Sequence, residues 1–321
     1  MQSDNFNRLL LAVGLAAAVG AAFGDRFTAN LLMWIATNAL LAASLRFVML
    51  VGEFNMAVVA FYAVGAYVSA FATVTLKLPL LVALLGGATV ATVVSVVFGY
   101  ITMRVKGPYF MLISFAFAEV LRLVLSRIEA VGGNNGIVGI FPPRWVEAYF
   151  PAATVAAVVL LLAGMYIIER SHYGKVFAAI KSNDAIVRSV GINLLGVKVM
   201  CLAIASFAAG MGGAFYSHAN NVISPGDFTF LVSVFALAYV KLGGESDPAG
   251  PILGAIVLTL LAQFLMRYGH REHLFYGAAI LLGMLALPDG VMGILVRLRL
   301  VIPSGPTAVA PAPAAAREKS A

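Results

Sequence analysis

The stretch Pro79–Met103, PLLVALLGGATVATVVSVVFGYITM, contains no Asp, Glu, Lys or Arg. A helix that crosses the hydrocarbon of a bilayer needs roughly 20 consecutive apolar residues. This stretch supplies them without interruption and therefore predicts a membrane-spanning helix.

Similar apolar stretches recur along the chain, separated by short polar segments. Together they predict about ten transmembrane helices, at residues 9–24, 28–50, 56–76, 79–103, 108–128, 151–168, 196–217, 228–241, 250–267 and 274–296. The predicted fold class is all-α, a polytopic helical bundle embedded in a lipid bilayer. Residues 1–302 form this transmembrane domain, and residues 303–321 form a disordered Pro/Ala-rich tail. The first stretch follows Arg8 and also has features of a signal peptide, so its removal stays an open alternative.

The composition agrees with a membrane protein. Of the 321 residues 62% are hydrophobic and 11% are charged, and the mean hydropathy is +0.97, whereas soluble domains are roughly 45–50% apolar and about 25% charged. A soluble enzyme, a disulfide scaffold and a disordered protein are thereby excluded. Cys201 is the only cysteine, and His270 and His273 have no third ligand nearby, so we expect neither a disulfide nor a metal site.

The net charge of +7 reflects membrane orientation rather than nucleic-acid binding, because the basic residues lie between apolar stretches instead of forming a stripe with aromatic residues. With the N-terminus in the cytoplasm, about twice as many Lys and Arg residues fall on the cytoplasmic side as on the other. The bias predicts that both termini are cytoplasmic.

The longest polar segment between two predicted spans is residues 169–193, a cytoplasmic loop (170–195) by the same count. Ser182 or Asn183 is a suitable N-cap for a short helix that runs to Val190, and Gly191 is a suitable end. The segment's apolar residues recur at helical spacing: Val176, Ala179, Ile180, Ile186, Val187 and Val190. This predicts a short amphipathic helix, which is either a solvated connector or a docking helix for a cytoplasmic partner.

Charges inside predicted spans are costly and point to functional positions. Glu119 and Arg122 lie at i, i+3 in one span and are expected to pair, either as a structural pair at a subunit interface or as contacts for the charged ends of a transported substrate. Asn55 either caps a helix or lines a transport path together with these two residues. Asn134 and Asn135 lie in a Gly-Gly-Asn-Asn-Gly turn on the external side, which either only reverses the chain or also shapes the mouth of the path.

One predicted span has small residues at every fourth position. They form two adjacent rows: Ala205, Ala209 and Gly213, and Ser206, Gly210 and Ala214. Because small side chains let helix backbones approach closely in lipid, we expect this helix to be tightly packed.

Five segments, in their order and spacing, carry a resemblance to a known family: Gly52–Tyr67, Gly132–Ile140, Asn183–Asn193, Ile223–Phe230 and Leu242–Ala255. The chain resembles the branched-chain amino acid permeases of ABC importers, specifically the longer of their two membrane subunits. The third segment lies where these permeases have their coupling loop. The coupling motif usually begins with Glu, whereas here Ala185 takes that position and Asp184 precedes it.

The resemblance implies a subunit of an ATP-driven importer in the bacterial inner membrane. The other parts would be a second permease subunit, two cytoplasmic ATP-binding subunits and a periplasmic substrate-binding protein. This chain has no Gly-x-x-x-x-Gly-Lys-Ser/Thr motif, so ATP and Mg²⁺ are expected on the partner subunits, with no cofactor and no catalytic residue here. The residues expected to couple to the ATPase are Lys181, Asp184, Ala185, Arg188 and Gly191, and those expected along the substrate path are Asn55, Glu119, Arg122, Asn134 and Asn135.

Two alternatives stay open. A permease for urea or short-chain amides has a similar scaffold. A secondary transporter driven by an ion gradient would use Glu119 and Arg122 as its coupling residues.

Overall fold

The computed structural model describes residues 25–265 and 290–297, together with residues 20, 277, 278, 280, 281 and 283. Its elements are α2 (Arg26–Met49), α3 (Val58–Val74), α4 (Leu80–Thr102), α5 (Pro108–Arg127), η1 (Glu129–Val131), η2 (Gly133–Asn135), β1 (Ile137–Val138), α6 (Arg144–Glu147), α7 (Phe150–Arg170), α8 (His172–Ser182), α9 (Asp184–Ser189), α10 (Leu194–Asn220), β2 (Val222–Ile223), η3 (Pro225–Phe228), α11 (Phe230–Gly243), α12 (Gly250–Leu265) and α14 (Gly290–Arg297). The predicted tail, His270 and His273 lie outside the described residues, as do nearly all of predicted span 9–24 and much of span 274–296.

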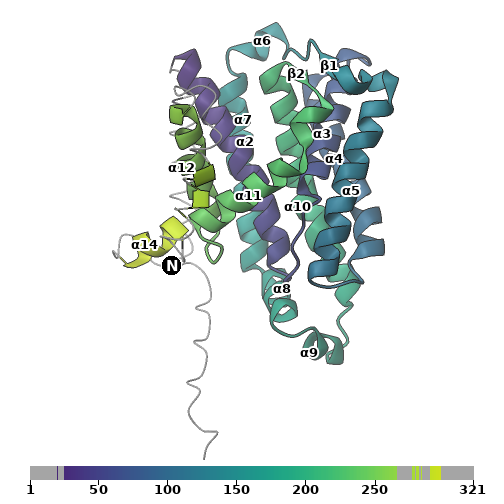
Figure 1. Ribbon diagram of the computed structural model, residues 1–321, viewed down its shortest axis with the longest axis vertical. Coiled ribbons are helices and arrows are strands. Elements are labelled where there is room, and N and C mark those ends of the chain that lie inside the picture. The colour runs from purple at the N-terminus through teal and green to yellow at the C-terminus, as the bar shows by residue number, and fades with distance from the viewer. Residues whose placement is uncertain are drawn as a thin grey trace, which may run out of the picture.

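The prediction of a polytopic helical bundle is confirmed (Figure 1). Five described helices are long and apolar enough to cross a membrane: α2, α4, α5, α7 and α10. Three shorter apolar helices, α3, α11 and α12, accompany them. For these eight helices the predicted boundaries differ from the observed ones by at most three residues at either end.

Helix boundaries follow local chemistry. Pro108 begins α5, where its missing N–H and fixed φ suit the first turn. Asn193 caps α10 by accepting a hydrogen bond from the Gly196 N–H at 3.1 Å. Asn221 ends α10 in the left-handed conformation, at φ 61°. The sequence therefore marks both ends of the longest described helix.

The centre of the bundle is held by close backbone contacts at glycines, as the small-residue rows predict. A Cβ at Gly65 of α3 would lie 2.0 Å from the Gly210 carbonyl oxygen of α10, and a Cβ at Gly213 would lie 1.9 Å from the Tyr62 carbonyl oxygen. A third such contact joins α11 and α12, where a Cβ at Gly254 would lie 1.9 Å from the Tyr239 carbonyl oxygen. Close packing replaces the hydrophobic driving force that lipid does not provide.

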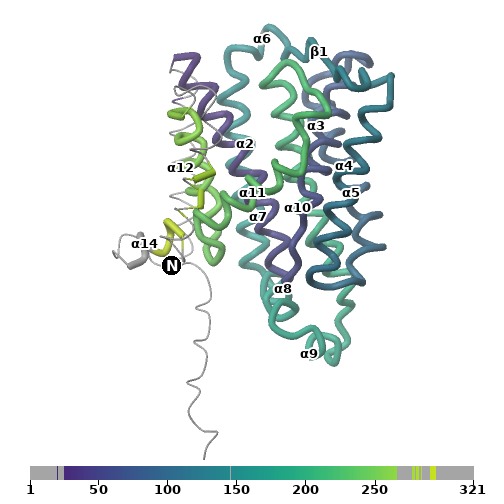
Figure 2. The backbone as a smooth tube through the Cα atoms, viewed as in Figure 1, coloured from purple at the N-terminus to yellow at the C-terminus, as the bar shows by residue number. Residues whose placement is uncertain are grey.

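Helix α2 connects two parts of the bundle. It packs against α10, which itself packs extensively against α3 and α4, and it also packs against α7, α11 and α12. Figure 2 shows α12 and α5 on opposite flanks of the bundle, with α2 and α10 between them. Movement of α2 relative to α10 would therefore change the packing of α10 with its neighbours and also that of α7, α11 and α12.

The two ends of the bundle differ in structure. At one end β1 and β2 pair antiparallel, with Ile137 opposite Ile223, and α8 and α9 lie at the other end (Figure 1). Gly136 packs against the backbone of the β2 strand, because a Cβ there would lie 1.9 Å from the Ile223 carbonyl oxygen. Two of the five family-like segments, Gly132–Ile140 and Ile223–Phe230, thus meet at one end.

Candidate functional site

The predicted cytoplasmic loop forms two helices, α8 and α9, joined at Asn183. The Asn183 side-chain oxygen accepts a hydrogen bond from the Ala185 N–H at 2.9 Å, so Asn183 rather than Ser182 is the N-cap of α9. Gly191 follows α9 at φ +81°. Sequence reasoning missed α8, although Ser171 caps it by accepting from the Tyr173 N–H at 3.2 Å.

Helix α8 packs on the end of α2. The buried Phe177 ring makes an edge-to-face contact with Phe47, with ring centroids 5.8 Å apart. Ile180 is also buried. Gly52, at φ +81°, lies against Lys181, where a Cβ would make an ordinary van der Waals contact at 3.4 Å from the Lys181 Cα. Helix α8 is therefore a fixed part of this end of the bundle.

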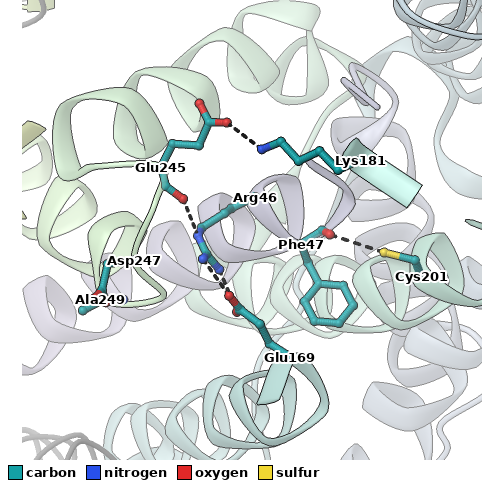
Figure 3. Close-up of polar contacts among 8 residues, drawn as sticks. All are labelled: Arg46, Phe47, Glu169, Lys181, Cys201, Glu245, Asp247 and Ala249. Atoms are coloured by element: carbon teal, nitrogen blue, oxygen red, sulfur yellow. Dashed lines mark hydrogen bonds and ion pairs between the residues drawn. The ribbon is translucent and has the colours of Figure 1, made fainter. Parts of the chain in front are cut away.

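A first ion-pair network surrounds Arg46 of α2 (Figure 3). The Arg46 guanidinium is buried and donates to both carboxylate oxygens of Glu169, each at 2.8 Å, and its Nε donates to the Glu245 carbonyl oxygen at 2.9 Å. The Glu245 carboxylate in turn accepts from the Lys181 Nζ at 3.4 Å. This network ties together α2, the end of α7, the α11–α12 connection and α8.

Glu245 lies between two helices and is charged at neutral pH. Burial alone would raise the pKa of Glu245, but the ammonium groups of Lys241 and Lys181 outweigh it and lower this pKa below its ordinary value of 4.5. The Glu245 carboxylate therefore keeps its negative charge across the physiological pH range.

A second ion-pair network surrounds Lys198 of α10. Lys198 and Glu53 are each 3% exposed, and the Lys198 Nζ lies 2.6 Å from Glu53 Oε1. The other Glu53 oxygen accepts from the Gly107 N–H at 3.2 Å, at the start of α5. Asp184 of α9 lies 3.8 Å from the Lys198 Nζ and pairs with Lys106. Sequence reasoning missed the Lys198–Glu53 pair because both residues lie at the ends of predicted spans, where charges are common.

The other side of α9 faces outward. Ile186 is 63% exposed and Val190 is 73% exposed. Arg188, Ala185 and Gly191 are exposed as well, whereas Val187 is buried. The five predicted coupling residues thus divide into two groups. Lys181 and Asp184 are paired within the chain, and the other three are presented to the surroundings.

The predicted path residues do not gather in one place. Glu119 and Arg122 form the predicted pair on α5, with the Arg122 Nε 3.0 and 3.1 Å from the two Glu119 oxygens. Asn55 is buried and its side-chain oxygen accepts from the Ala57 N–H at 3.0 Å, which holds the turn before α3. Asn134 and Asn135 are exposed in η2. Their role in a substrate path stays a prediction.

The fold and these networks define a class: a multi-pass membrane protein with a short helix at one end linked to several spanning helices. Residues 27–295 match the family described as branched-chain amino acid transport system / permease component. Because this match covers most of the chain, the protein belongs to that family of transport permeases.

Known relatives agree with this family. The chain is 25% identical over 262 residues to the high-affinity branched-chain amino acid transport system permease protein LivM of Salmonella typhimurium, covering 72% of this chain and 62% of that protein. It is 26% identical to LivM of Escherichia coli with the same coverage. It is 22% identical over 284 residues to the ribose import permease protein RbsC of Escherichia coli, covering 81% of this chain and 84% of RbsC. The chain thus spans less than two thirds of the length of these two LivM proteins. No solved structure matches the chain.

Proposed function

We propose that this chain is a permease subunit of an ATP-driven importer in the bacterial inner membrane, and that its substrates are branched-chain or other aliphatic amino acids. It works with a second permease subunit, two cytoplasmic ATP-binding subunits and a periplasmic binding protein. Membership of the permease family and similarity to LivM support this assignment. ATP and Mg²⁺ bind the partner subunits, and this chain catalyses no reaction itself.

The observation that carries the proposal is the outward face of α9. Ile186 in α9 and Val190 at its C-cap are four positions apart, and both are mostly exposed. Helix α9 stands at the extreme end of the bundle (Figure 1). Exposed aliphatic side chains grouped on a projecting helix favour a protein partner, because covering them releases water from apolar surface. An ATP-binding subunit is the partner that the family provides.

The orientation follows from the Lys and Arg distribution. With both termini in the cytoplasm, α8, α9 and the networks around Arg46 and Lys198 lie at the cytoplasmic end. The β1–β2 pair, Asn134 and Asn135 lie at the periplasmic end, where the binding protein delivers substrate. We therefore propose that the turn at Asn134 and Asn135 contacts the binding protein.

Helix α5 is proposed to face the second permease subunit and the path. Of the five long helices it is the least buried, because only 22% of the residues in its most apolar part are buried. It exposes large apolar residues such as Leu112 and Val120, and it carries the Glu119–Arg122 pair on the same helix. An ion pair in contact with lipid is unfavourable. Protein or a water-filled path covering this helix would relieve that cost.

The test is reconstitution. The chain is co-purified with the products of its neighbouring genes and placed in liposomes loaded with ATP, and uptake is measured for leucine, for urea and for ribose, the last because of the similarity to RbsC. We expect ATP-dependent leucine uptake that survives an uncoupler. Uptake that collapses with the ion gradient would favour the secondary transporter, and transport of urea or ribose instead would overturn the substrate assignment.

A further inference from the structure

Lys198 is a cation with two carboxylates in reach. Its Nζ lies 2.6 Å from Glu53 and 3.8 Å from Asp184, and its side chain is 4% exposed. Lysine is almost never buried to this degree unless it is paired. The two carboxylates belong to different parts of the molecule: Glu53 lies between α2 and α3, and Asp184 is the first residue of α9.

Glu53 holds several elements in place at once. One of its oxygens contacts Lys198 of α10, and the other accepts from the Gly107 N–H at the N-cap of α5. Glu53 itself follows Gly52, whose positive φ breaks the chain between α2 and α3. A change in the charge balance at Glu53 would therefore reach α3, α5 and α10 together.

Asp184 connects this buried group to α9. It is the first residue of α9, and its 16% exposed side chain pairs with Lys106. A charge-assisted hydrogen bond between an ammonium and a carboxylate is about 2.7–2.9 Å long. A displacement of about 1 Å would thus bring Asp184 into direct contact with the Lys198 Nζ. The flexible four-carbon stem of lysine can follow either carboxylate.

We propose that Lys198 is a positioning residue that transmits movement of α9 to the connection between α2 and α3 and to the start of α5. This inference rests on the proposed function. In the structure the Lys198 ammonium contacts Glu53. When the partner displaces α9, Asp184 draws the ammonium toward itself and Glu53 loses its cation. The connection between α2 and α3 and the start of α5 are then released from α10.

The test measures uptake per ATP hydrolysed in the reconstituted complex. Lys198→Met removes the cation, and Asp184→Asn removes the link to α9 while leaving the buried Lys198–Glu53 pair in place. For both variants we expect hydrolysis to continue and uptake per ATP to fall at least about fivefold, the lower end of typical coupling between sites. Lys198→Arg keeps the charge and should restore most of the coupling. The control is Lys175→Met, which replaces an exposed lysine of α8, and its uptake per ATP should equal that of wild type.

Non-additivity separates transmission from simple stabilisation. If Asp184 acts through Lys198, the double variant Asp184→Asn with Lys198→Met should be no worse coupled than Lys198→Met alone. Wild-type uptake per ATP in Asp184→Asn overturns the inference, and so do losses that multiply in the double variant. If Lys198→Met does not assemble, Asp184→Asn alone decides. A wild-type complex without ATP-dependent uptake would instead refute the proposed function.

Discussion

The ion pair between Arg46 and Glu169 allows a quantitative test of how this end of the bundle is held together. The proposed change is Glu169→Gln. In the wild-type protein the guanidinium donates two hydrogen bonds of 2.8 Å to the carboxylate, and the Arg46 side chain is 6% exposed. The substitution keeps one acceptor oxygen and removes the negative charge, so Arg46 remains buried without the carboxylate that pairs with it.

The expected magnitude follows from burial. Removing one partner of a buried ion pair typically costs about 3–5 kcal/mol. Glu169 is 18% exposed, so water reaches part of the site, and the Glu245 carbonyl oxygen still accepts from Arg46. We therefore expect a loss at or just below the lower limit of that range, about 2–3 kcal/mol of unfolding free energy.

The assay is reversible unfolding of the purified protein in mixed micelles titrated with sodium dodecyl sulfate, applied to a double-mutant cycle. Arg46→Met, Glu169→Gln and the double variant are compared with wild type. The double variant should be less destabilised than the sum of the single variants by at least about 1 kcal/mol, because the pair acts as a unit.

The control is Glu147→Gln in α6, an exposed carboxylate at the other end of the bundle. It should change stability by no more than about 0.5 kcal/mol. Strictly additive losses in the cycle, or a Glu169→Gln effect as small as this control, would refute the reasoning from burial.

Three further predictions concern α9, the bundle core and pH. Gly191→Val should reduce uptake several-fold without unfolding the spans, because φ +81° strains a β-branched residue while its Cβ meets open space. Gly191→Asn is the control because Asn tolerates this φ, and equal uptake by the two variants would contradict the explanation. Gly65→Ala should abolish the monodisperse peak of folded protein in size-exclusion chromatography, since its Cβ would lie 2.0 Å from a carbonyl oxygen of α10. Gly86→Ala is the control, because a Cβ at Gly86 meets open space, and a normal profile for Gly65→Ala would disprove the close contact. Because the pKa of Glu245 is lowered, its stabilising charge is present above the ordinary carboxyl pKa of 4.5 and is lost only as pH falls through the lower value in the folded protein. The hydrogen-exchange protection of α8 should accordingly be the same at about pH 5 and about pH 7.5, once intrinsic rates are corrected. Protection that is weaker at the lower pH in wild type but not in Glu245→Gln would contradict the lowered pKa of Glu245.

The spanning helices were predictable because a bilayer leaves the backbone few choices. A charge-free stretch such as Pro79–Met103 must satisfy its own hydrogen bonds in hydrocarbon, and a helix does so. The predicted start at Pro108 is also the observed start of α5, whereas the predicted span 196–217 began two residues after Leu194, the first residue of α10. The rows of small residues likewise predicted close packing, which Gly210 and Gly213 make with α3.

The arrangement of charges at the end of the bundle that carries α8 and α9 was not predictable, because it depends on contacts between distant parts of the chain. Lys198 and Glu53 are separated by 145 positions in the sequence, and each resembles an ordinary charge at the end of a span. Similarly, Lys181 and Asp184 belong to a segment that reads as solvated. In the folded protein Lys181, although its side chain is half exposed, pairs with Glu245, and Asp184 lies 3.8 Å from the buried Lys198 Nζ. Ile186 and Val190 stay exposed.

The most direct test of the central claim is site-specific labelling with a membrane-impermeant maleimide. Ile186→Cys in α9 and Val138→Cys in β1 are a matched pair, since both native residues are 63% exposed and they lie at opposite ends of the bundle; the native Cys201 is buried. We expect Ile186→Cys to react only in inside-out vesicles and to be protected when the ATP-binding subunits are bound, and Val138→Cys to react only from the periplasmic side. Labelling of Ile186→Cys from outside the cell, or labelling unchanged by the bound subunits, would contradict the account.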